Sequence, residues 1–420
     1  MLPLISVAQL LAVFLVLGGM PAFAAAESRN PSTEVSGEFQ LKHFPALRWN
    51  AVVGLSSSIP PERIITGSVE GTGLSLRGQL KLDPTPGIGR WTLDSATLAL
   101  ETWFAPLADV LGFDRPAGDL SLAGELHAHG GGTLDRGDPR GILQVNLSKA
   151  TLASESRALR ISGMELSGAF EGPAPLRSIG ASSLSFSDAN FGGIAARSGH
   201  IDFIITENRE LHIQRAHIEV LGGTVELRDE RIPLESILAG EVSASLHLSQ
   251  LSMRDISALL PDVIAEARGR VSGEIRVGWK PAEGFKLGNG RLQIERPESV
   301  EIRLTPQPGF LTSHTPERLT LLPSWTGALQ KWFSPRNPAY ETLRQIEMGL
   351  MSLQVETLSA EVHPAGDSMG RSATVRISAR PAVASAVDRI DFEVNVSGPL
   401  DEVIKLGMNH KVSIRNGSVP

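Results

Sequence analysis

Cysteine is absent from this chain of 420 residues, so disulfide bridges, thiolate metal sites, iron–sulfur clusters and cysteine nucleophiles are all excluded. An excess of basic residues is missing too, because 39 Lys and Arg stand against 46 Asp and Glu, a formal net charge of −7. A dedicated nucleic-acid-binding protein would show a basic stripe, so we expect no nucleic-acid partner. Aromatic residues make up only 5% of the chain, which leaves little bulk to fill a thick globular core.

Charged side chains are also missing from the first 26 residues, since the first one is Glu27. An apolar run over Leu10–Leu17 is followed by small residues, and Ala24-Ala25-Ala26 fits a signal-peptidase cleavage pattern. Residues 1–26 therefore predict a signal peptide, with an uncleaved membrane anchor as the alternative. The run is shorter than the ~20 residues of a spanning helix, which favours the signal peptide. For a large exported chain without cysteine, we expect the periplasm of a bacterium.

What the sequence does contain is alternation of apolar and polar residues, the period of a strand with one buried face. The segment Leu74–Leu82 is one example, and roughly twenty such segments with short spacing indicate an all-β protein. Further strands are predicted at 120–128, 143–147, 216–220, 242–248, 271–277, 300–304, 373–379 and 390–396. Turns are expected at 84–87, 130–132, 222–223 and 288–290, where Gly, Pro and Asn cluster.

A glycine recurs inside these segments in the pattern apolar-x-Gly-x-apolar. It occurs at Gly78, Gly124, Gly168, Gly273 and Gly398. The glycine falls in phase with the apolar face, so we expect β-bulges or a strand bent over a concave surface at these positions. Chance recurrence in a glycine-rich β protein is the alternative.

Few helices are expected. The candidates are Trp103–Leu111, Met253–Leu260 and Asn337–Leu350. In the last of these, Asn337 can cap the helix and Pro338 suits its first turn. This helix would carry one apolar stripe, formed by Leu343, Ile346 and Leu350. Such helices would plug an open end of the sheet or cover one of its edges.

The strand composition predicts one long sheet. Inward positions carry mostly single aliphatic residues, whereas a β-sandwich needs bulky residues on two inner faces. Twenty strands spaced ~4.8 Å apart would extend over about 100 Å. We therefore predict a mostly β protein, an elongated antiparallel sheet curled into a gutter or taco-like β-groove, with a few short helices. Two or three compact β-sandwich domains are the alternative.

An aliphatic row along such a gutter suits acyl chains, because each CH₂ removed from water gains ~0.8 kcal/mol. The predicted groove residues share inward strand positions. They are Leu76, Leu80, Leu122, Leu126, Val145, Ile218, Val242, Leu246, Val271, Ile275, Val277, Val375, Ile377, Phe392 and Val394. The alternative is a structural or adhesive protein whose row packs against itself. A binding protein for one small ligand would need a compact pocket with converging polar groups, which is not evident.

Motifs for catalysis are not found, since G-x-S-x-G, H-E-x-x-H and Walker A sequences are all missing. His127 and His129 share one strand face with Glu125, which could hold a metal ion. The other face belongs to Leu126 and Ala128, so we expect the histidines to face solvent. We therefore expect neither an enzyme nor a cofactor.

Several segments together resemble the YdbH-like proteins. They are Gly269–Ile275, Gly284–Leu292, Pro308–Phe310, Tyr340–Leu343 and Val396–Leu400, with Leu221–Val225 and Leu251–Leu260 upstream. YdbH-like proteins are grouped with the AsmA-like and TamB-like proteins, whose long β-groove carries phospholipid between the inner and outer membranes of Gram-negative bacteria. The resemblance implies a non-enzymatic phospholipid-conducting groove over roughly residues 116–405.

The resemblance also implies how the ends are organised. Residues 27–115 would be a shortened N-terminal β segment, because family members are usually considerably longer. Inner-membrane contact is implied at the N-terminus, where family members usually carry an uncleaved anchor. A small outer-membrane lipoprotein could add strands at the C-terminal edge, near Asp391–Val396 and Lys411–Ile414. The alternative is that the tail, residues 406–420, folds back over that edge.

Overall fold

The computed structural model describes residues 32–40, 44–85, 87–110, 120–136, 138–155, 158–172, 177–191, 194–239, 241–258, 264–280, 284–294, 300–319, 334–363 and 371–397. Over these residues the protein is mostly β, an antiparallel sheet of 21 strands with a few short helices. The predicted fold class is confirmed. The chain divides into two compact units: unit 1 comprises residues 1–218 and 227–242, and unit 2 comprises residues 219–226 and 243–420.

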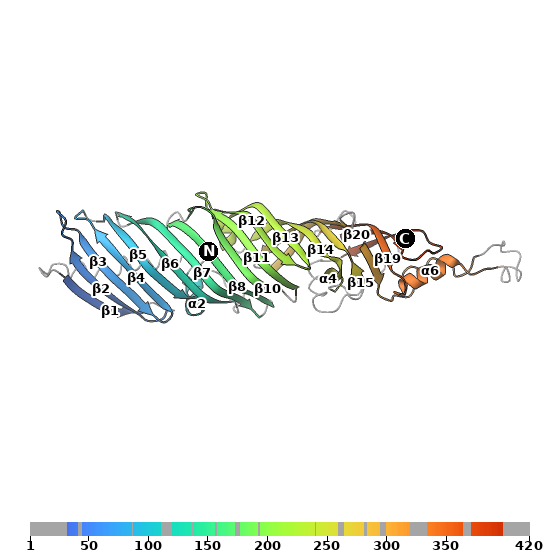
Figure 1. Ribbon diagram of the computed structural model, residues 1–420, viewed down its shortest axis with the longest axis horizontal. Coiled ribbons are helices and arrows are strands. Elements are labelled where there is room, and N and C mark those ends of the chain that lie inside the picture. The colour runs from blue at the N-terminus through green and yellow to red at the C-terminus, as the bar shows by residue number, and fades with distance from the viewer. Residues whose placement is uncertain are drawn as a thin grey trace. The chain divides into compact units, whose positions relative to one another are not determined.

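Unit 1 is built from strands that follow one another in the chain. They are β1 (Ser32–Phe39), β2 (Leu47–Leu55), β3 (Arg63–Gly71), β4 (Leu74–Leu82), β5 (Gly89–Ala99), β6 (Ser121–Asp135), β7 (Asp138–Ser154), β8 (Leu159–Gly172), β9 (Arg177–Ser178), β10 (Ser182–Phe191), β11 (Ile194–Ile205), most of β12 (Glu210–Val220) and most of β13 (Gly223–Pro233). From β1 to β8 each strand pairs with the next one, and β8 then pairs with β9 and β10. Figure 1 shows β1 to β8 side by side in chain order. Most of these connections are short, and a tight turn brings the next strand back antiparallel, whereas residues 100–120 separate β5 from β6.

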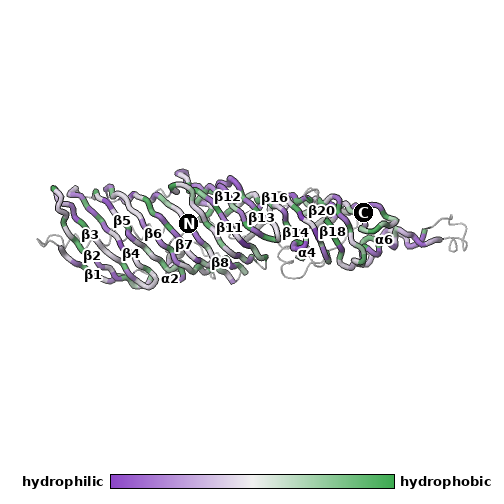
Figure 2. The backbone as a smooth tube through the Cα atoms, in the orientation of Figure 1, coloured by the Kyte–Doolittle hydropathy of each residue, from purple (hydrophilic) through white to green (hydrophobic). Residues whose placement is uncertain are grey.

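One face of this sheet is apolar. In β7, Leu143, Val145 and Leu147 are buried, whereas Gln144 and Asn146 between them are exposed. Figure 2 shows the same alternation of hydrophobic and hydrophilic residues along the strands of unit 1. The predicted period of two is therefore confirmed, and it places one face of the sheet in the core and the other in water.

Unit 2 has a less regular strand order. Its strands are most of β14 (Val242–Ser252), β15 (Ile264–Arg268), β16 (Arg270–Lys280), β17 (Gly284–Ile294), β18 (Val300–Leu304), β19 (Leu353–Val362), β20 (Arg371–Pro381) and β21 (Ile390–Ser397). Strand β19 pairs through its first half with β18, through its second half with β17, and along its other edge with β20. Strand β20 pairs in turn with β21. A second hydrophobic cluster, which includes Val300, Ile346 and Leu353, lies within this unit.

The part of the chain that the structure describes contains four helices: α2 (Leu100–Val110), α3 (Leu234–Leu238), α4 (Met253–Ser257) and α6 (Pro338–Glu347). Helices α2, α4 and α6 correspond to the three predicted helices, and α2 begins earlier than predicted. For α6, Asn337 Oδ1 accepts from the Ala339 N–H at 3.1 Å, so the predicted cap is confirmed.

The predicted end of α6 is wrong. The helix stops at Glu347, because Gly349 adopts a left-handed φ of +67° that ends the helical turn. Ile346 is fully buried, but Leu350 lies beyond the helix and is 78% exposed. The apolar stripe therefore ends one turn earlier than the spacing suggests. Residues 111 and 259–260 of the other two predicted helices lie outside the described residues.

Two predicted turns are wrong for a shared reason. Residues 130–132 lie inside β6, and residues 288–290 lie inside β17. A Cβ atom on Gly132 would lie 1.9 Å from the Arg140 carbonyl oxygen, so glycine is needed here for close approach of two backbones. In β17 the glycines lie opposite a register shift between Ile275 and Val277. The turn predicted at Gly222-Gly223 does connect β12 to β13.

The recurring glycines behave as predicted where the structure describes them. The register between β4 and β5 shifts at Gly78, and that between β6 and β7 shifts around Gly124. A Cβ on Gly168 would lie 2.7 Å from Phe170 Cζ, and one on Gly273 would lie 2.0 Å from the Arg291 carbonyl oxygen. Bulges and close approaches therefore explain the motif. Gly398 lies outside the described residues.

Candidate functional site

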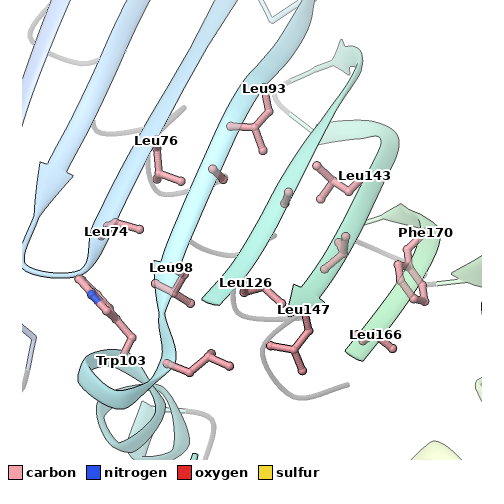
Figure 3. Packing of buried hydrophobic residues seen from close by; sticks show 14 of the residues in the cluster. Leu74, Leu76, Leu93, Leu98, Trp103, Leu126, Leu143, Leu147, Leu166 and Phe170 are labelled. Atoms are coloured by element: carbon pink, nitrogen blue, oxygen red, sulfur yellow. The ribbon is translucent and has the colours of Figure 1, made fainter. Parts of the chain in front are cut away.

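The apolar face of unit 1 carries a continuous row of branched aliphatic side chains, here called the leucine row. The strand register aligns one member from each of seven strands. They are Leu74, Leu98, Leu126, Leu147, Leu166, Leu184 and Ile201. Figure 3 shows the first five of these side chains on the same side of the sheet. No charged residue interrupts the row, so its surface is apolar from β4 to β11.

A second row runs beside the leucine row and has shorter side chains. Leu76 pairs with Ala96, Ala96 with Ala128, and Ala128 with Val145. Val145 in turn pairs with Gly168 in β8. Alanine and glycine occupy three of these five positions, so the side chains of this row are shorter than those of the leucine row.

The predicted groove residues of unit 1 fall into two groups. Leu76, Leu80, Leu126 and Val145 are buried in the hydrophobic cluster, and Leu122 packs against it. Ile218 and Val242 are only half-buried and belong to neither the cluster nor its partly buried neighbours. The side chains of the first group pack within the hydrophobic cluster, whereas those of the second group keep part of their apolar surface exposed to solvent.

Unit 2 shows the same division. Val271 and Ile377 are buried in its hydrophobic cluster, and Val375 packs against that cluster. The half-buried members lie outside it; they are Leu246 in β14 and Ile275 and Val277 in β16. Strands β14 and β16 pair with each other, so these three side chains come from adjacent strands. The side chains of Phe392 and Val394, on β21, lie outside the described residues.

Helix α2 covers one margin of the apolar face of unit 1. Trp103 is fully buried, and its Nε1–H donates to the Thr72 carbonyl oxygen at 2.8 Å. The Trp103 and Phe44 rings lie 5.5 Å apart between centroids. Figure 3 shows Trp103 beside Leu74 and Leu98, at the end of the leucine row. The strands that α2 contacts, β5 and β6, are each paired on both sides, so this helix lies at strand ends and does not cover an edge strand of the sheet.

The outer face of the sheet in unit 2 is charged. Arg376 Nε lies 3.0 Å from Glu393 Oε2, and Arg376 Nη1 lies 3.7 Å from Glu361 Oε2. Arg389 Nε likewise lies 3.0 Å from Asp391 Oδ1. These side chains are half-exposed or exposed, so each pair adds little stability but keeps the face hydrated.

The histidines of β6 face solvent, as predicted. His127 is 44% exposed, and its Nε2 lies 3.4 Å from Glu125 Oε2. His129 is exposed on the same face. Within the described ranges, no three His, Cys, Asp or Glu side chains come close enough to hold a metal ion. The helices of the described part also include none that is long and apolar enough to cross a membrane.

Glu347 is a buried carboxylate that the sequence reasoning missed. Its Oε2 accepts from the Leu311 and Thr312 N–H groups at 2.9 and 3.1 Å, and its Oε1 accepts from Thr312 Oγ1 at 2.8 Å. Burial by itself would raise the pKa of Glu347, but the hydrogen bonds from Leu311, Thr312 and Gly309 outweigh it and lower the pKa. This carboxylate ties the loop after β18 to α6, two segments on which the family resemblance rests.

Comparison with protein families gives one match. A family model described as YdbH-like, intermembrane phospholipid transport protein YdbH, matches residues 35–317. Neither the curated proteins nor the solved structures include a match. The matched residues run from within β1 to beyond β18, so they contain the whole leucine row and more than half of the chain. The resemblance inferred from short segments is confirmed, and the chain belongs to the YdbH-like family of intermembrane phospholipid transport proteins.

Proposed function

We propose that this protein is a phospholipid conduit that holds acyl chains against the apolar face of its sheet while the polar head group stays in water. The leucine row is the observation that carries the proposal. Family membership supports the same cargo. The conduit requires no catalytic step, since it only replaces water around the acyl chain with protein.

The energetics favour movement along the row. Each CH₂ that leaves water gains ~0.8 kcal/mol, so a long acyl chain is strongly retained on an apolar face. Successive strands lie ~4.8 Å apart and present nearly the same side chain, so the chain meets a similar environment at each step. A repeated environment keeps the barrier between neighbouring positions low.

The two groups of predicted groove residues have different roles in this proposal. The half-buried side chains Ile218, Val242, Leu246, Ile275 and Val277 make the first contact with acyl chains. The buried ones, Leu76, Leu80, Leu122, Leu126, Val145, Val271, Val375 and Ile377, exchange contacts with one another for contacts with lipid.

Lipid content of the purified protein tests the proposal directly. Native mass spectrometry and lipid extraction should find several phospholipids on each chain. Leu246→Asp and Val277→Asp should lower this occupancy, because a carboxylate on an acyl-contact surface is costly to desolvate. Ile142→Asp is the matched control, since Ile142 is exposed on the opposite face of β7.

Three outcomes separate the alternatives. Loss of lipid in well-folded Leu246→Asp and Val277→Asp, with Ile142→Asp unchanged, supports the conduit. A wild-type protein free of lipid favours a structural or adhesive envelope protein instead. Unchanged occupancy in all three folded variants would show that Leu246 and Val277 do not contact the lipid.

Location and partner form part of the same proposal. The chain works in the periplasm, either released from residues 1–26 or held by them at the inner membrane. A small outer-membrane lipoprotein adds strands beyond β21, whose described pairing is with β20. Deleting residues 405–420, which lie outside the described residues, should abolish co-purification of this lipoprotein while the circular dichroism spectrum stays unchanged. Retained binding would contradict it.

A further inference from the structure

Trp91 has a buried polar atom without a partner. The side chain lies on the apolar face of β5 and is 3% exposed, as part of the hydrophobic cluster of unit 1. Its Nε1–H finds no hydrogen-bond acceptor in the described part of the chain. A buried donor left unsatisfied has lost its hydrogen bond to water without gaining another, which is unfavourable. Trp103, in the same cluster, is different because its Nε1–H donates a hydrogen bond to the Thr72 carbonyl oxygen.

The neighbours of Trp91 explain why the indole can lie there. Trp91 pairs with Leu80 on one side and with Gly132 on the other, and Gly132 pairs with Gly141. A Cβ on Gly141 would lie 2.6 Å from Trp91 Cζ2. The glycines therefore keep a place for the ring on the sheet, and neither they nor Leu80 supplies a side-chain acceptor.

The position of Trp91 in its strand indicates what the acceptor is. Strand β5 begins at Gly89, so Trp91 lies near the strand end, whereas Leu98 of the leucine row lies toward the other end. Its paired neighbours are uncharged, and a phosphate would lose its hydration there without a cation to compensate. A neutral carbonyl oxygen costs less to bury, and in a diacyl lipid the ester carbonyls adjoin the acyl chains.

We propose that Trp91 Nε1–H donates a hydrogen bond to a glycerol-ester carbonyl oxygen of the bound lipid. This inference rests on the proposed function and adds a recognition element to it. The leucine row holds the apolar chains without regard to how they are linked, and Trp91 distinguishes an ester from a linkage that has no carbonyl. Diacyl phospholipids should therefore bind better than dialkyl ether phospholipids with the same head group and chain length.

The test compares these two lipids on the full chain. Delipidated wild-type protein and Trp91→Phe are titrated with vesicles of diacyl or of dialkyl phosphatidylethanolamine, and bound lipid is counted by native mass spectrometry. The wild type should bind the diacyl lipid roughly 3- to 10-fold more tightly, the usual worth of one hydrogen bond. Trp91→Phe should bind the two lipids equally. Inorganic phosphate should not compete, which separates the ester from the phosphate as acceptor.

Each result has a distinct meaning. Equal binding of both lipids by the wild type overturns the inference but leaves the conduit intact, whereas binding of neither lipid overturns the proposed function. A preference for the diacyl lipid that persists in folded Trp91→Phe also overturns the inference. If that variant does not fold, the wild-type comparison still decides. Trp103→Phe is the control, and it should keep the preference because its Nε1–H already has a partner.

Discussion

Trp103 donates its indole N–H to the carbonyl oxygen of Thr72, and this 2.8 Å hydrogen bond ties α2 to the turn between β3 and β4. The turn contains Gly73, whose φ of +69° suits a tight reversal. A Cβ on Gly73 would lie 2.8 Å from the Ala99 Cβ, so the turn and the start of α2 are also in close contact. One indole thus joins the helix to two strands.

Replacing Trp103 tests this link. Trp103→Phe removes the N–H and part of the ring, so the Thr72 carbonyl loses its partner and a small cavity forms. We expect the free energy of unfolding to fall by about 1–3 kcal/mol. Urea denaturation followed by circular dichroism measures the change. An unchanged midpoint would mean that α2 is not held by this bond.

The one-sided core predicts a contrast between neighbouring strands. Leu126 in the leucine row is 1% exposed, whereas Ile142 on the outer face of β7 is 45% exposed. Leu126→Ala should lower the free energy of unfolding by about 2–5 kcal/mol. Ile142→Ala should change it by about 0.5 kcal/mol or less. Equal losses in the two variants, measured by chemical denaturation, would argue that both faces are packed.

The close approach at Gly132 predicts that even one methyl group is too large there. Gly132→Ala would place a Cβ 1.9 Å from the Arg140 carbonyl oxygen, so β6 and β7 would have to separate. We expect a loss of about 1–3 kcal/mol in thermal unfolding. Gly180→Ala is the control: its Cβ meets nothing within 4 Å, although its φ of +82° still strains an alanine. A smaller loss at Gly132 than at Gly180 would contradict the observed register.

Glu347 predicts how the stability of unit 2 changes with pH. Its pKa is lowered in the folded protein, so its contribution is present above the ordinary pKa of a glutamate and is lost as the pH falls through the folded value. Acidification below the folded pKa of Glu347 should therefore lower the protection factors of the Leu311 and Thr312 amides, which compare each exchange rate with the intrinsic rate at the same pH. Glu347→Gln should lower these protection factors already at pH 7 and make them less dependent on acid.

Glu341→Gln is the control for this prediction, because Glu341 is exposed on the same helix. Exchange at the Leu311 and Thr312 amides should match the wild type in Glu341→Gln at every pH. Protection that persists in Glu347→Gln would show that the loop after β18 is held by other contacts.

Much of the fold could be predicted because alternation is a local property. The segment Leu74–Leu82 predicts a strand without reference to any other residue, and β4 has the same bounds. A glycine is harder to interpret, because tight turns and close approaches of two strands both favour this residue. Only the neighbouring strand shows that Gly132 and Gly141 lie under Trp91 rather than in a turn.

The candidate site could be predicted only in part. The inward direction of Leu126 and Val145 follows from alternation, but their burial depends on side chains of other strands. For the same reason, the sequence did not distinguish buried Val271 from half-buried Val277 on one strand. Glu347 was missed because its partners, Leu311 and Thr312, lie in a distant loop.

The strand order of unit 1 has a consequence for how such a chain can change in length. From β1 to β8 each strand contacts its sequence neighbours, so the sheet behaves as a one-dimensional array. Inserting or deleting two consecutive strands with their turn keeps the direction of every remaining strand, and with it which face is apolar. Losing a single strand would instead reverse the direction of all that follow. Relatives of this chain should therefore differ in length by whole hairpins.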